Sequence, residues 1–557
     1  MSTVSTAPPP SPTLSPATAY RAEAVARAER DLTASTDRYM HLAARALALA
    51  AARELRGAAG RATGRDVLLL VGGGHNGGDA LLAGALLARR GCAVTAALAT
   101  DHPHADALRE AERAGVRPAP EPAAACERAA AGGTALVIDG LTGIGATGPL
   151  RARAAALVAP LAAAGRRGAR PFRVMAVDLP SGAGVDDGTV AGPVLAADLS
   201  VTFTCLKGAH ILPPAAGACG RVEVADLGLP VPADPGAVVA SRPADADLGR
   251  LLRVPGDADH KYTRGVVGLW AGSRTYPGAA VLTASAAVRC GAGMVRLSAP
   301  HRVEDLVLAR RPEVVPAPGR CQALVIGPGT DPADVVRGAE LDAVVVRALD
   351  DDGPDPAAPA DPARGPLPAV FDAGALLLLA ERLRGGMRCA PAHILTPHAG
   401  EAAALLTTLG GPTSRARVEA APAACALELA RLTGGTVLLK GAPTLIAAPD
   451  APSAPAGSAR PRLLSVDAGP GWLATAGSGD ALAGVLGTVL AAAQCDAERG
   501  GPAVDAPQCA ALAVRLHAVA AELASGLRDA PPGRPLAALD LADHLPHACA
   551  AVGGWAS

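Results

Sequence analysis

The sequence predicts an α/β fold in two domains, each built on a mostly parallel sheet with helices on its faces. Length is the first indication, because 557 residues exceed what a single hydrophobic core usually organises. From about residue 66, short apolar runs alternate with Gly-rich turns and longer Ala/Leu stretches, which is typical of βα units. Aromatic residues make up only 2% of the chain, with 64 Gly and 50 Pro, which favours a core of Ala, Val and Leu over an aromatic-rich sandwich.

The expected strands form two series along the chain. In the first half they are DVLLLV (66–71), TALVID (134–139) and FRVMAVD (172–178). In the second half they are VVGLWAG (266–272), ALVIG (323–327), AVFD (369–372), HILT (393–396) and TVLLK (436–440), with a hairpin onto TLIAA (444–448). The Pro/Asp/Ala-rich stretch 231–248 separates the two series. We therefore expect a disordered tail at 1–18, a first domain at 19–232, a linker at 233–244, a second domain at 245–557, and solvated insertions at 350–366 and 449–462.

Charge and cysteine usage exclude several classes of function. With 51 Lys and Arg against 52 Asp and Glu, the net charge of −1 gives no field that would steer the protein to nucleic acid or to an anionic membrane. The 11 cysteines are scattered without a CxxC pair, as expected for small buried residues in a reducing compartment. The N-terminus lacks the basic start and apolar run of a signal peptide. We therefore expect a soluble, cytoplasmic protein that binds small molecules, not nucleic acid or membrane.

The turn GGGHNGGD after the first strand has the glycine spacing of a dinucleotide fingerprint, with Gly72, Gly74 and Gly77 in place. Its free backbone N–H groups suit a pyrophosphate, although a plain strand-to-helix turn remains an alternative. A dehydrogenase is disfavoured, because the next strand ends in Thr100 with the first acidic residue, Asp101, only beyond it.

Three further oxygen-bearing side chains follow strands of the same domain. Asp139 and Asp178 end two strands, and Ser181 follows the second of these strands. In an open parallel sheet the carboxyl ends of the strands lie at one edge, where ligands bind, so these side chains should converge there. Asn76, Asp139 and Ser181 offer hard oxygen ligands to a monovalent cation. A carboxylate in a cleft exchanges protons readily, and we expect Asp178 to be the catalytic one.

The motifs GGGHNGGD, VIDGLTGIGATGP, AVDLPSG and TFTCLKGAHILPPAAGACGRVEVADLGLP, in that order, resemble the YjeF N-terminal family of NAD(P)H-hydrate epimerases over about residues 20–230. The resemblance implies a Rossmann-like αβα sandwich with K⁺ held by Asn76, Asp139 and Ser181. It departs from the family at His75, which is usually Asn, and at Ala80, which is usually Gly. The implied substrate contacts are His75, Asn76, Gly77, Gly78, Asp79, Gly143, Ile144, Gly145, Ala146, Thr147, Gly148, Pro149 and Asp178.

In the second domain, TAGSGDALAG places Gly477, Ser478, Gly479 and Asp480 at the start of a long helix. The free N–H groups there make an anion hole, and Asp480 is placed to take a proton from a hydroxyl. The alternative is a structural helix cap. The hairpin LLKGAPTLIA adds Lys440, which would ordinarily be a solvated lysine. The junction TPHAGE adds His398, which would ordinarily be a loop residue with its hydrogen bonds satisfied.

The segments HKYTRGVVGLWAGSRTYPGAAVLTASAAVRCGAGMVRLSAP, VIGPGT, ILTPHAGE, LLKGAPT and ATAGSGDALAG resemble the ADP- or ATP-dependent NAD(P)H-hydrate dehydratases of ribokinase-like fold over about residues 245–545. In FDAGALLLL the family carries a second acidic residue where this chain has Gly374, which leaves Asp372 alone. The implied hydrate contacts are Ala279, Gly329, His398 and Asp480, with Asp480 catalytic, and the implied nucleotide contacts are Lys440, Gly441, Ala442, Pro443, Thr444 and Gly479.

Together the resemblances imply repair of the hydrates of NADH and NADPH (NADHX and NADPHX). One domain would epimerise the R and S hydrates, and the other would dehydrate the S hydrate with Mg²⁺ and ADP, or ATP, in a homo-oligomer. Nucleotide use has a chemical reason: water is a far weaker acid than phosphate, whose second pKa is roughly 6, so hydroxide leaves far less readily than phosphate.

Two other functions compete with this one. Ribokinase-like folds also phosphorylate small molecules with the same GxGD motif, although TPHAGE and YPGAA favour the hydrate enzymes. Domains of the first type also serve as RNA-processing or protein-interaction scaffolds, which would require a basic face or a degraded cleft. The near-zero net charge and the presence of Asp139, Asp178 and Ser181 argue against a scaffold.

Overall fold

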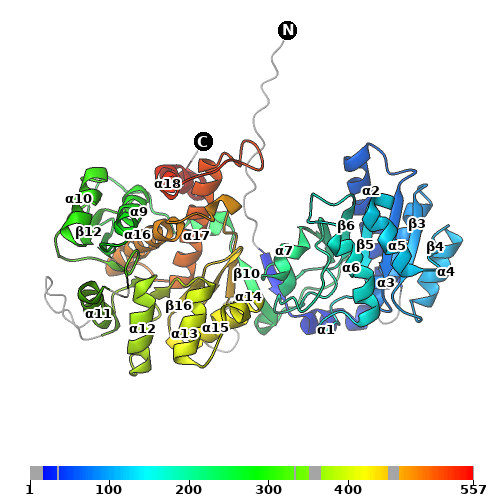
Figure 1. Cartoon of the computed structure of the whole chain (residues 1–557), viewed down its shortest axis with the longest axis horizontal. Coiled ribbons are helices and arrows are strands. Elements are labelled where there is room, and N and C mark those ends of the chain that lie inside the picture. Colours follow the sequence, from blue (N-terminus) through cyan, green and yellow to red (C-terminus); the bar gives the residue numbers. More distant parts are fainter. Residues whose placement is uncertain (1–16, 34–36, 332–333, 351–365, 450–462, 556–557) are drawn as a thin grey trace, which may run out of the picture. The chain divides into compact units, whose positions relative to one another are not determined.

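The computed structural model describes residues 17–33, 37–331, 334–350, 366–449 and 463–555. They divide into two compact units, the N-terminal unit from Thr18 to Ser241 and the C-terminal unit from Arg242 onward (Figure 1). The division falls inside the linker expected at 233–244, which contains a 3₁₀ turn, η3 (Pro235–Ala237), and a strand, β10 (Val238–Arg242). The tail expected at 1–18 is also too long, because strand β1 (Ala17–Tyr20) begins within it. The rest of that tail and residues 351–365 and 450–462 of the two insertions lie outside the described residues.

The N-terminal unit is built on a parallel sheet in the order β4-β3-β2-β5-β6-β7-β9, beside a short parallel pair of β1 and β8. Its strands are β2 (Asp66–Val71), β3 (Ala93–Leu98), β4 (Arg117–Pro118), β5 (Leu136–Gly140), β6 (Arg173–Val177), β7 (Leu199–Phe203), β8 (Leu206–Lys207) and β9 (Arg221–Ala225). Its helical segments are α1 (Ala22–Thr33), α2 (Arg38–Ala59), α3 (His75–Ala88), α4 (Ala105–Arg113), α5 (Pro122–Arg128), the π turn η1 (Ala129–Gly133), α6 (Ala152–Ala163), η2 (Gly208–His210) and α7 (Ala215–Cys219).

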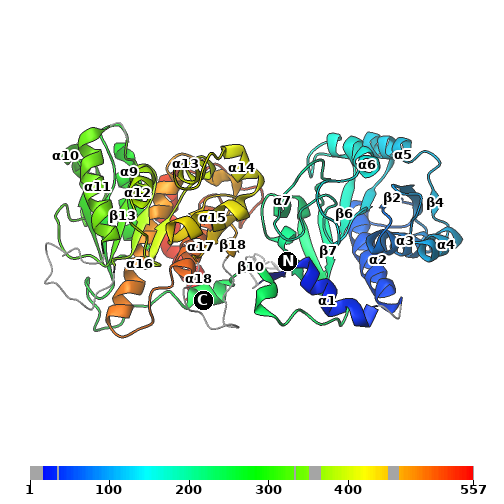
Figure 2. The ribbon, with the colours of Figure 1, turned by 90° about the horizontal axis from the view of Figure 1, so that it is seen from below.

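Two hydrophobic layers cover this sheet. Residues of α2, α3 and α4 pack with one face of the strands, and residues of α5 and α6 pack with the other (Figure 2). The strand residues are buried on both faces, which explains why β2 has the continuous apolar sequence VLLLV with no polar alternation.

The turn between β2 and α3 depends on a glycine that has no room for a side chain. A Cβ at Gly72 would lie 1.9 Å from the backbone oxygen of Leu141, whereas a Cβ at Gly74 would meet nothing within 4 Å. We expect Gly72→Ala to destabilise the N-terminal unit by about 1–3 kcal/mol, because a backbone carbonyl cannot move aside as a side-chain end can. Gly74→Ala should change the stability by at most about 1 kcal/mol. Denaturant unfolding of both variants measures the difference, and equal stabilities would contradict the packing argument.

The C-terminal unit has strands in the order β12-β11-β13-β14-β15-β16-β17-β18, parallel as far as β16 and antiparallel from β16 to β18. The strands are β11 (Val266–Trp270), β12 (Met294–Ser298), β13 (Ala323–Ile326), β14 (Ala369–Phe371), β15 (His393–Leu395), β16 (Thr436–Leu439), β17 (Thr444–Ala447) and β18 (Leu463–Val466). The helical segments are α8 (Asp245–Gly249), α9 (Pro277–Arg289), α10 (His301–Arg310), α11 (Val335–Leu349), α12 (Gly374–Arg384), α13 (Ala399–Leu409), α14 (Arg415–Ala420), α15 (Pro422–Thr433), η4 (Gly471–Leu473), α16 (Ser478–Glu498), α17 (Ala506–Ala524) and α18 (Ala538–Gly553).

Helices α9, α16 and α17 contribute to one large core on a single face of this sheet, with α18 packed behind them (Figure 1). Helices α11, α12 and α15 contact strands from the other face. Among the described residues, α16 is the one helix long and apolar enough to span a membrane, but 67% of its most apolar stretch is buried within the protein. Its hydropathy is therefore that of a central core helix. The two mostly parallel sheets with helices on both faces confirm the expected α/β fold class.

Candidate active sites

In the N-terminal unit, β2, β5 and β6 are neighbours in the sheet, so the residues at their carboxyl ends meet at one edge. This places Asn76, in the first turn of α3, close to the loop after β5 and to the end of β6. The Asn76 Nδ2 group donates to the backbone oxygens of Thr142 (3.0 Å) and Val177 (2.9 Å). The strand order thus brings together segments about a hundred residues apart, as expected from the sequence.

Asp139 and Ser181 bind each other directly and are both fully buried. The Ser181 hydroxyl donates to Asp139 Oδ1 (2.6 Å), and the Ser181 backbone N–H donates to Asp139 Oδ2 (2.9 Å). The Thr142 N–H in turn donates to Ser181 Oγ (3.0 Å), which joins this pair to the loop that also accepts from Asn76. Burial raises the pKa of Asp139, although its hydrogen bonds from Ser181 oppose that shift.

Asn76, Asp139 and Ser181 offer oxygen atoms, which are the kind of ligand that suits a hard cation. The amide nitrogen of Asn76 makes the two hydrogen bonds to Thr142 and Val177, which leaves its oxygen available. That oxygen faces Gly143, because a Cβ at Gly143 would lie 2.4 Å from it. Asp139 keeps part of its acceptor capacity, since a carboxylate has about four lone-pair sites. The three residues implied by the resemblance are therefore linked to one another through Thr142.

Asp178 lies directly after β6, is 4% exposed, and has the left-handed backbone angle φ of 67°. Its Oδ1 accepts from Lys207 Nζ (2.9 Å) and from the Thr202 hydroxyl (2.6 Å). Both charged side chains of this ion pair are almost completely buried, at 3% and 5% exposure. His210 Nδ1 accepts from the Lys207 backbone N–H, so His210 Nε2 carries the proton that it donates to the backbone oxygen of Asp178 (2.9 Å).

These contacts set the charge state of Asp178. Burial alone would raise its pKa, but the charge of Lys207, the neighbouring His210 and the hydrogen bonds from Thr202 and Lys207 together outweigh burial and hold the pKa below its usual range. Burial lowers the pKa of His210, which keeps that imidazole neutral. Sequence reasoning missed Lys207, Thr202 and His210 as parts of the site, even though all three stand in the quoted motif TFTCLKGAH.

A cavity of about 860 Å³ opens onto this edge of the sheet. Of the implied substrate contacts, those that line it are His75, Asn76, Asp79, Gly143, Ile144, Gly145, Ala146 and Asp178. Gly77 and Gly78 are buried in α3 behind the lining, and Thr147, Gly148 and Pro149 follow it along the loop. Glu29, Arg30 and Tyr39 from the first two helices also line the cavity, which no motif had indicated.

In the C-terminal unit, β13, β14, β15 and β16 are neighbours. The residues that follow them, including Gly329, Asp372, His398 and Lys440, therefore lie along one edge of the sheet. The Lys440 backbone N–H donates to the oxygen of Pro397 (2.9 Å), which ties the loop after β16 to the loop after β15. The expected hairpin from β16 to β17 is present, with Lys440 at its tip.

Lys440 joins Asp372 to the helix that carries Asp480. Its Nζ lies 2.7 Å from Asp372 Oδ1, which also accepts from the Thr396 hydroxyl (2.7 Å). Gly479 is close by, since a Cβ there would lie 3.4 Å from Lys440 Nζ. Burial and the charge of Asp372 raise the pKa of Asp480 to about 6, against the opposing effect of Lys440.

Two of the implied hydrate contacts touch each other. Gly329 adopts a φ of 64°, and a Cβ there would lie 2.2 Å from the Ala279 side chain on α9. At Gly374, where the family carries an acid, a Cβ would lie 2.4 Å from Thr330 Oγ1. The space that a second carboxylate would need is therefore taken by Thr330, whose hydroxyl donates to the oxygen of Gly327 (2.6 Å).

His398 has a structural role as well as an exposed ring. Its Nδ1 caps α13 by accepting from the N–H groups of Gly400 and Glu401, and its own N–H donates to Glu401 Oε2 (2.9 Å). The side chain is 60% exposed, and its Nε2 lies 3.7 Å from Glu401 Oε1. In the hairpin, the buried Thr444 hydroxyl donates to the oxygen of Gly441 (3.0 Å), across the turn that Ala442 and Pro443 complete.

His517 on α17 is a further residue that sequence reasoning missed. Its Nε2 lies 3.0 Å from the backbone oxygen of Ser478, and burial lowers its pKa to about 4. A neutral His517 therefore donates to the first residue of α16 and fixes the turn that precedes Asp480. No local motif marks it, because it lies 39 residues from Ser478.

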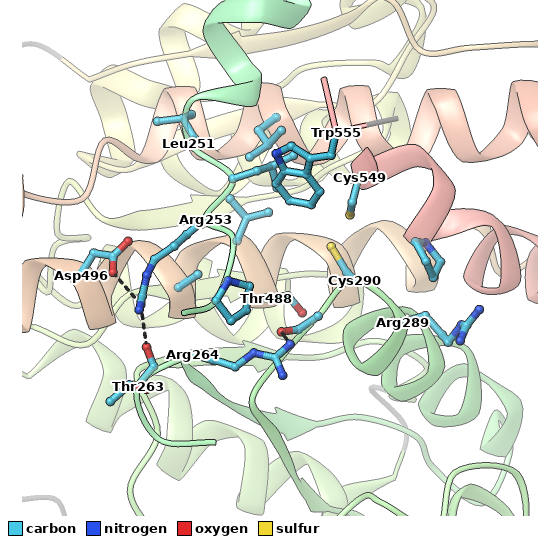
Figure 3. Close-up of a pocket in the computed structure, with 17 residues that line it drawn as sticks. Leu251, Arg253, Thr263, Arg264, Arg289, Cys290, Thr488, Asp496, Cys549 and Trp555 are labelled. Atoms are coloured by element: carbon cyan, nitrogen blue, oxygen red, sulfur yellow. Dashed lines mark hydrogen bonds and ion pairs between the residues drawn. The ribbon is translucent and has the colours of Figure 1, made fainter. Parts of the chain in front are cut away.

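A different cavity of about 270 Å³ in the C-terminal unit is shown in Figure 3. Its lining includes Cys290, Cys549 and Trp555 but none of the residues predicted for the site. Arg253 is already bound there, to the oxygen of Thr263 (3.0 Å) and to Asp496 (3.2 Å). The sheet edge beside Lys440 and Asp480 is therefore the candidate site of this unit.

The fold and these two edges define a class of protein: a two-unit α/β enzyme with a separate small-molecule site in each unit. Residues 36–209 match the family described as YjeF-related protein N-terminus, and residues 267–533 match the family described as NAD(P)H-hydrate dehydratase. The Bifunctional NAD(P)H-hydrate repair enzyme Nnr of Mycobacterium leprae is 39% identical over 542 residues, which is 96% of this chain and 99% of that protein. Its counterpart in Mycobacterium tuberculosis is 41% identical over 484 residues, 85% and 89% of the two chains. The chain belongs to the family of bifunctional NAD(P)H-hydrate repair enzymes, and the expected combination of epimerase and dehydratase is confirmed.

Two further likenesses each cover one part of the chain. The NAD(P)H-hydrate epimerase of Microbacterium testaceum is 44% identical over 215 residues, 38% of this chain and 78% of that protein. The crystal structure of the ADP/ATP-dependent NAD(P)H-hydrate dehydratase from Bacillus subtilis, co-crystallised with ATP and Mg²⁺, is 26% identical with a TM-score of 0.40, over 55% of this chain and 95% of that one.

Proposed function

We propose that the N-terminal unit interconverts the R and S hydrates of NADH and NADPH, and that the C-terminal unit dehydrates the S hydrate with ADP, or ATP, and releases phosphate. The observation that carries this proposal is the Asp480 carboxyl at the start of α16, beside the pair of Lys440 and Asp372. Spontaneous hydration gives both epimers, whereas a chiral pocket accepts one. An epimerase on the same chain lets the pair of units clear the whole damaged pool.

In the dehydratase, the C6 hydroxyl oxygen attacks the terminal phosphorus of the nucleotide as Asp480 takes the hydroxyl proton. The nucleotide departs one phosphate shorter, then the C6–O bond breaks with its electron pair on phosphate, and a proton leaves C5 to restore the C5–C6 double bond. Lys440 and the free N–H groups at the start of α16 stabilise the charge on the transferring group. Asp480 suits this role, because its pKa of about 6 lets it accept a proton near neutral pH.

Mg²⁺ fits this site as an ion held mainly by nucleotide oxygens. Within the described residues there is no cluster of three metal-binding side chains, and Mg²⁺ commonly takes only one or two carboxylates besides substrate phosphates. Asp480 and Asp372 are the carboxylates in reach. When bound, the ion would neutralise phosphate charge.

In the epimerase, Asp178 exchanges a proton with the C6 hydroxyl or with the water that replaces it. Lys207, Thr202 and His210 hold Asp178 ionised and oriented toward the cavity. K⁺ would be held by Asn76, Asp139 and Ser181, where it would fix the Gly143 loop against the substrate. The K⁺ site can be tested by dialysing the purified chain free of K⁺ and measuring its epimerase activity after K⁺ or Na⁺ is restored.

The remaining parts of the proposal concern the setting of the enzyme. We place it in the cytoplasm as a homo-oligomer whose partners are NADHX, NADPHX and ADP, with no nucleic acid or membrane partner. The support is the near-zero net charge and the burial of α16, the one membrane-length apolar helix of the described chain.

Incubation with a mixture of R and S hydrated NADH tests the function as a whole. With K⁺, Mg²⁺ and ADP, we expect the dihydronicotinamide absorbance to return for the full pool and phosphate to be released in equal amount. A parallel reaction with ATP compares the two nucleotides. Accumulation of a stable phosphorylated product without NADH would show a small-molecule kinase instead, and no change in either hydrate would favour a scaffold.

A further inference from the structure

A second carboxyl shares the epimerase cavity with Asp178. Asp79, near the start of α3, lines the cavity and is only 6% exposed. Among the described residues its side chain makes no hydrogen bond and no ion pair, in contrast to Asp178 with its bonds to Lys207 and Thr202. A buried carboxylate without a partner is costly, so the neutral, protonated form of Asp79 is favoured.

The surroundings push the two carboxyls toward opposite charge states. Burial, and then the negative charge of Asp178, hold the pKa of Asp79 well above its usual range. Lys207 holds the pKa of Asp178 below its usual range. The other titratable or charged groups that line the cavity are Glu29, Arg30, Asp37, Tyr39, His75, His104, Arg151 and Lys207, and His210 faces Asp178 from behind. Burial also raises the pKa of Glu29, against the opposing charge of Lys207, and the ion pair of Lys207 is with Asp178.

We propose that Asp79 is a second catalytic residue of the epimerase, the general acid that complements Asp178 as general base. This inference rests on the proposed epimerase function. Pairs of carboxyls whose surroundings separate their protonation states are a common way to place an acid and a base in one site. The family resemblance implies a substrate contact at Asp79 and no part for it in proton transfer.

The step balances without an external reagent other than water. Asp79 gives its proton to the C6 hydroxyl, the C6–O bond breaks with its electron pair on the departing water, and the ring nitrogen lone pair forms a C6=N1 iminium. A water molecule then adds to the opposite face of C6, and Asp178 takes its proton. The product is the other epimer, with Asp79 ionised and Asp178 protonated, which are the states needed for the reverse reaction. Exchange with solvent restores the starting states for another forward turnover.

The test follows conversion of the pure R hydrate to the S hydrate by the full chain, with nucleotide omitted and the epimers separated chromatographically. Asp79→Asn keeps the shape of the side chain but cannot transfer a proton, so we expect kcat to fall by about 100- to 10,000-fold with KM little changed. Asp79→Glu should retain part of the activity. Asp106→Asn, at an exposed acid of the same unit, should retain all of it.

The pH profile distinguishes an acid from a residue that merely packs. Activity of the unaltered chain should fall at high pH as Asp79 loses its proton and at low pH as Asp178 gains one. Asp79→Asn should remove the high-pH limb, and Asp178→Asn the low-pH limb, from the residual activity. In ¹⁸O-labelled water the product should carry label at C6, and Asp79→Asn should slow labelling and epimerisation equally.

Two results would overturn the inference while leaving the epimerase intact: full activity of Asp79→Asn with both limbs preserved, or epimerisation with the original oxygen retained. Failure of the unaltered chain to epimerise either hydrate would instead remove the proposed function itself. The dehydratase activity of each variant on the S hydrate, at the other site of the same chain, gives an internal standard for protein concentration. A normal thermal unfolding transition shows that a slow variant is folded.

Discussion

Asp480→Asn is expected to lower nucleotide-dependent dehydration of the S hydrate by about 100- to 10,000-fold, because the amide cannot accept the proton of the C6 hydroxyl. Epimerisation of the R hydrate should continue at its normal rate, since that site lies in the other unit. The measurement is the return of dihydronicotinamide absorbance with ADP, beside chromatographic separation of the two hydrates. Asp257→Asn, at an exposed acid of the same unit, is the matched control and should change neither activity.

The pH dependence of dehydration gives this prediction a second measurement. A general base must be ionised, and the pKa of Asp480 is raised to about 6, so kcat should be maximal above that pH and fall as the pH decreases through it. A rate that stays constant from pH 7 down to pH 5 would assign the proton transfer to another group. Unimpaired dehydration by Asp480→Asn would do the same, whatever the pH profile.

Lys207→Met is expected to have the largest effect on stability, a loss of about 3–5 kcal/mol in the N-terminal unit together with loss of epimerase activity. The reason is that the substitution leaves the buried Asp178 carboxylate without its cation. All three tryptophans, Trp270, Trp472 and Trp555, lie in the C-terminal unit, so their fluorescence reports unfolding of that unit alone. Denaturant unfolding followed by far-ultraviolet circular dichroism should therefore shift, while the tryptophan transition should not.

Two companion variants separate charge burial from a general loss of packing. Arg27→Met removes an exposed pair with Glu23 and should cost at most about 1 kcal/mol. The double variant Asp178→Asn with Lys207→Met removes both charges and should be more stable than Lys207→Met alone, because no unpaired charge remains buried. A double variant less stable than Lys207→Met would show that the ion pair is not the cause.

Much of the fold could be predicted from the sequence, because buried parallel strands are continuous apolar runs that end in a polar residue or a glycine. DVLLLV, TALVID and FRVMAVD all contain strands of the N-terminal sheet, and the hairpin at Lys440 forms as expected. The sequence predicts a linker where strand β10 lies, because the strand sequence VVASR is short and flanked by Pro-rich stretches. A strand of that kind is stabilised by its neighbours, which a local pattern does not reveal.

The candidate sites, too, could be predicted from the sequence only in part. Residues at the carboxyl ends of strands of the N-terminal sheet, such as Asp139 and Asp178, could be placed at one edge because sheet order alone brings those ends together. Lys207 and His517 could not be placed. Each acts on a residue that is distant along the chain, Lys207 on Asp178 and His517 on Ser478, through a contact that only the packed fold creates.

By itself the sequence determined the class of the chain, its two-part α/β architecture and the residue types at each site, since apolar periodicity and short motifs are local properties. Only the tertiary structure decided the charge states: it paired Lys207 with Asp178, buried Asp79 with no partner among the residues described, and raised the pKa of Asp480 to about 6. Burial and the distances between charges control ionisation, and both exist only once the chain has folded.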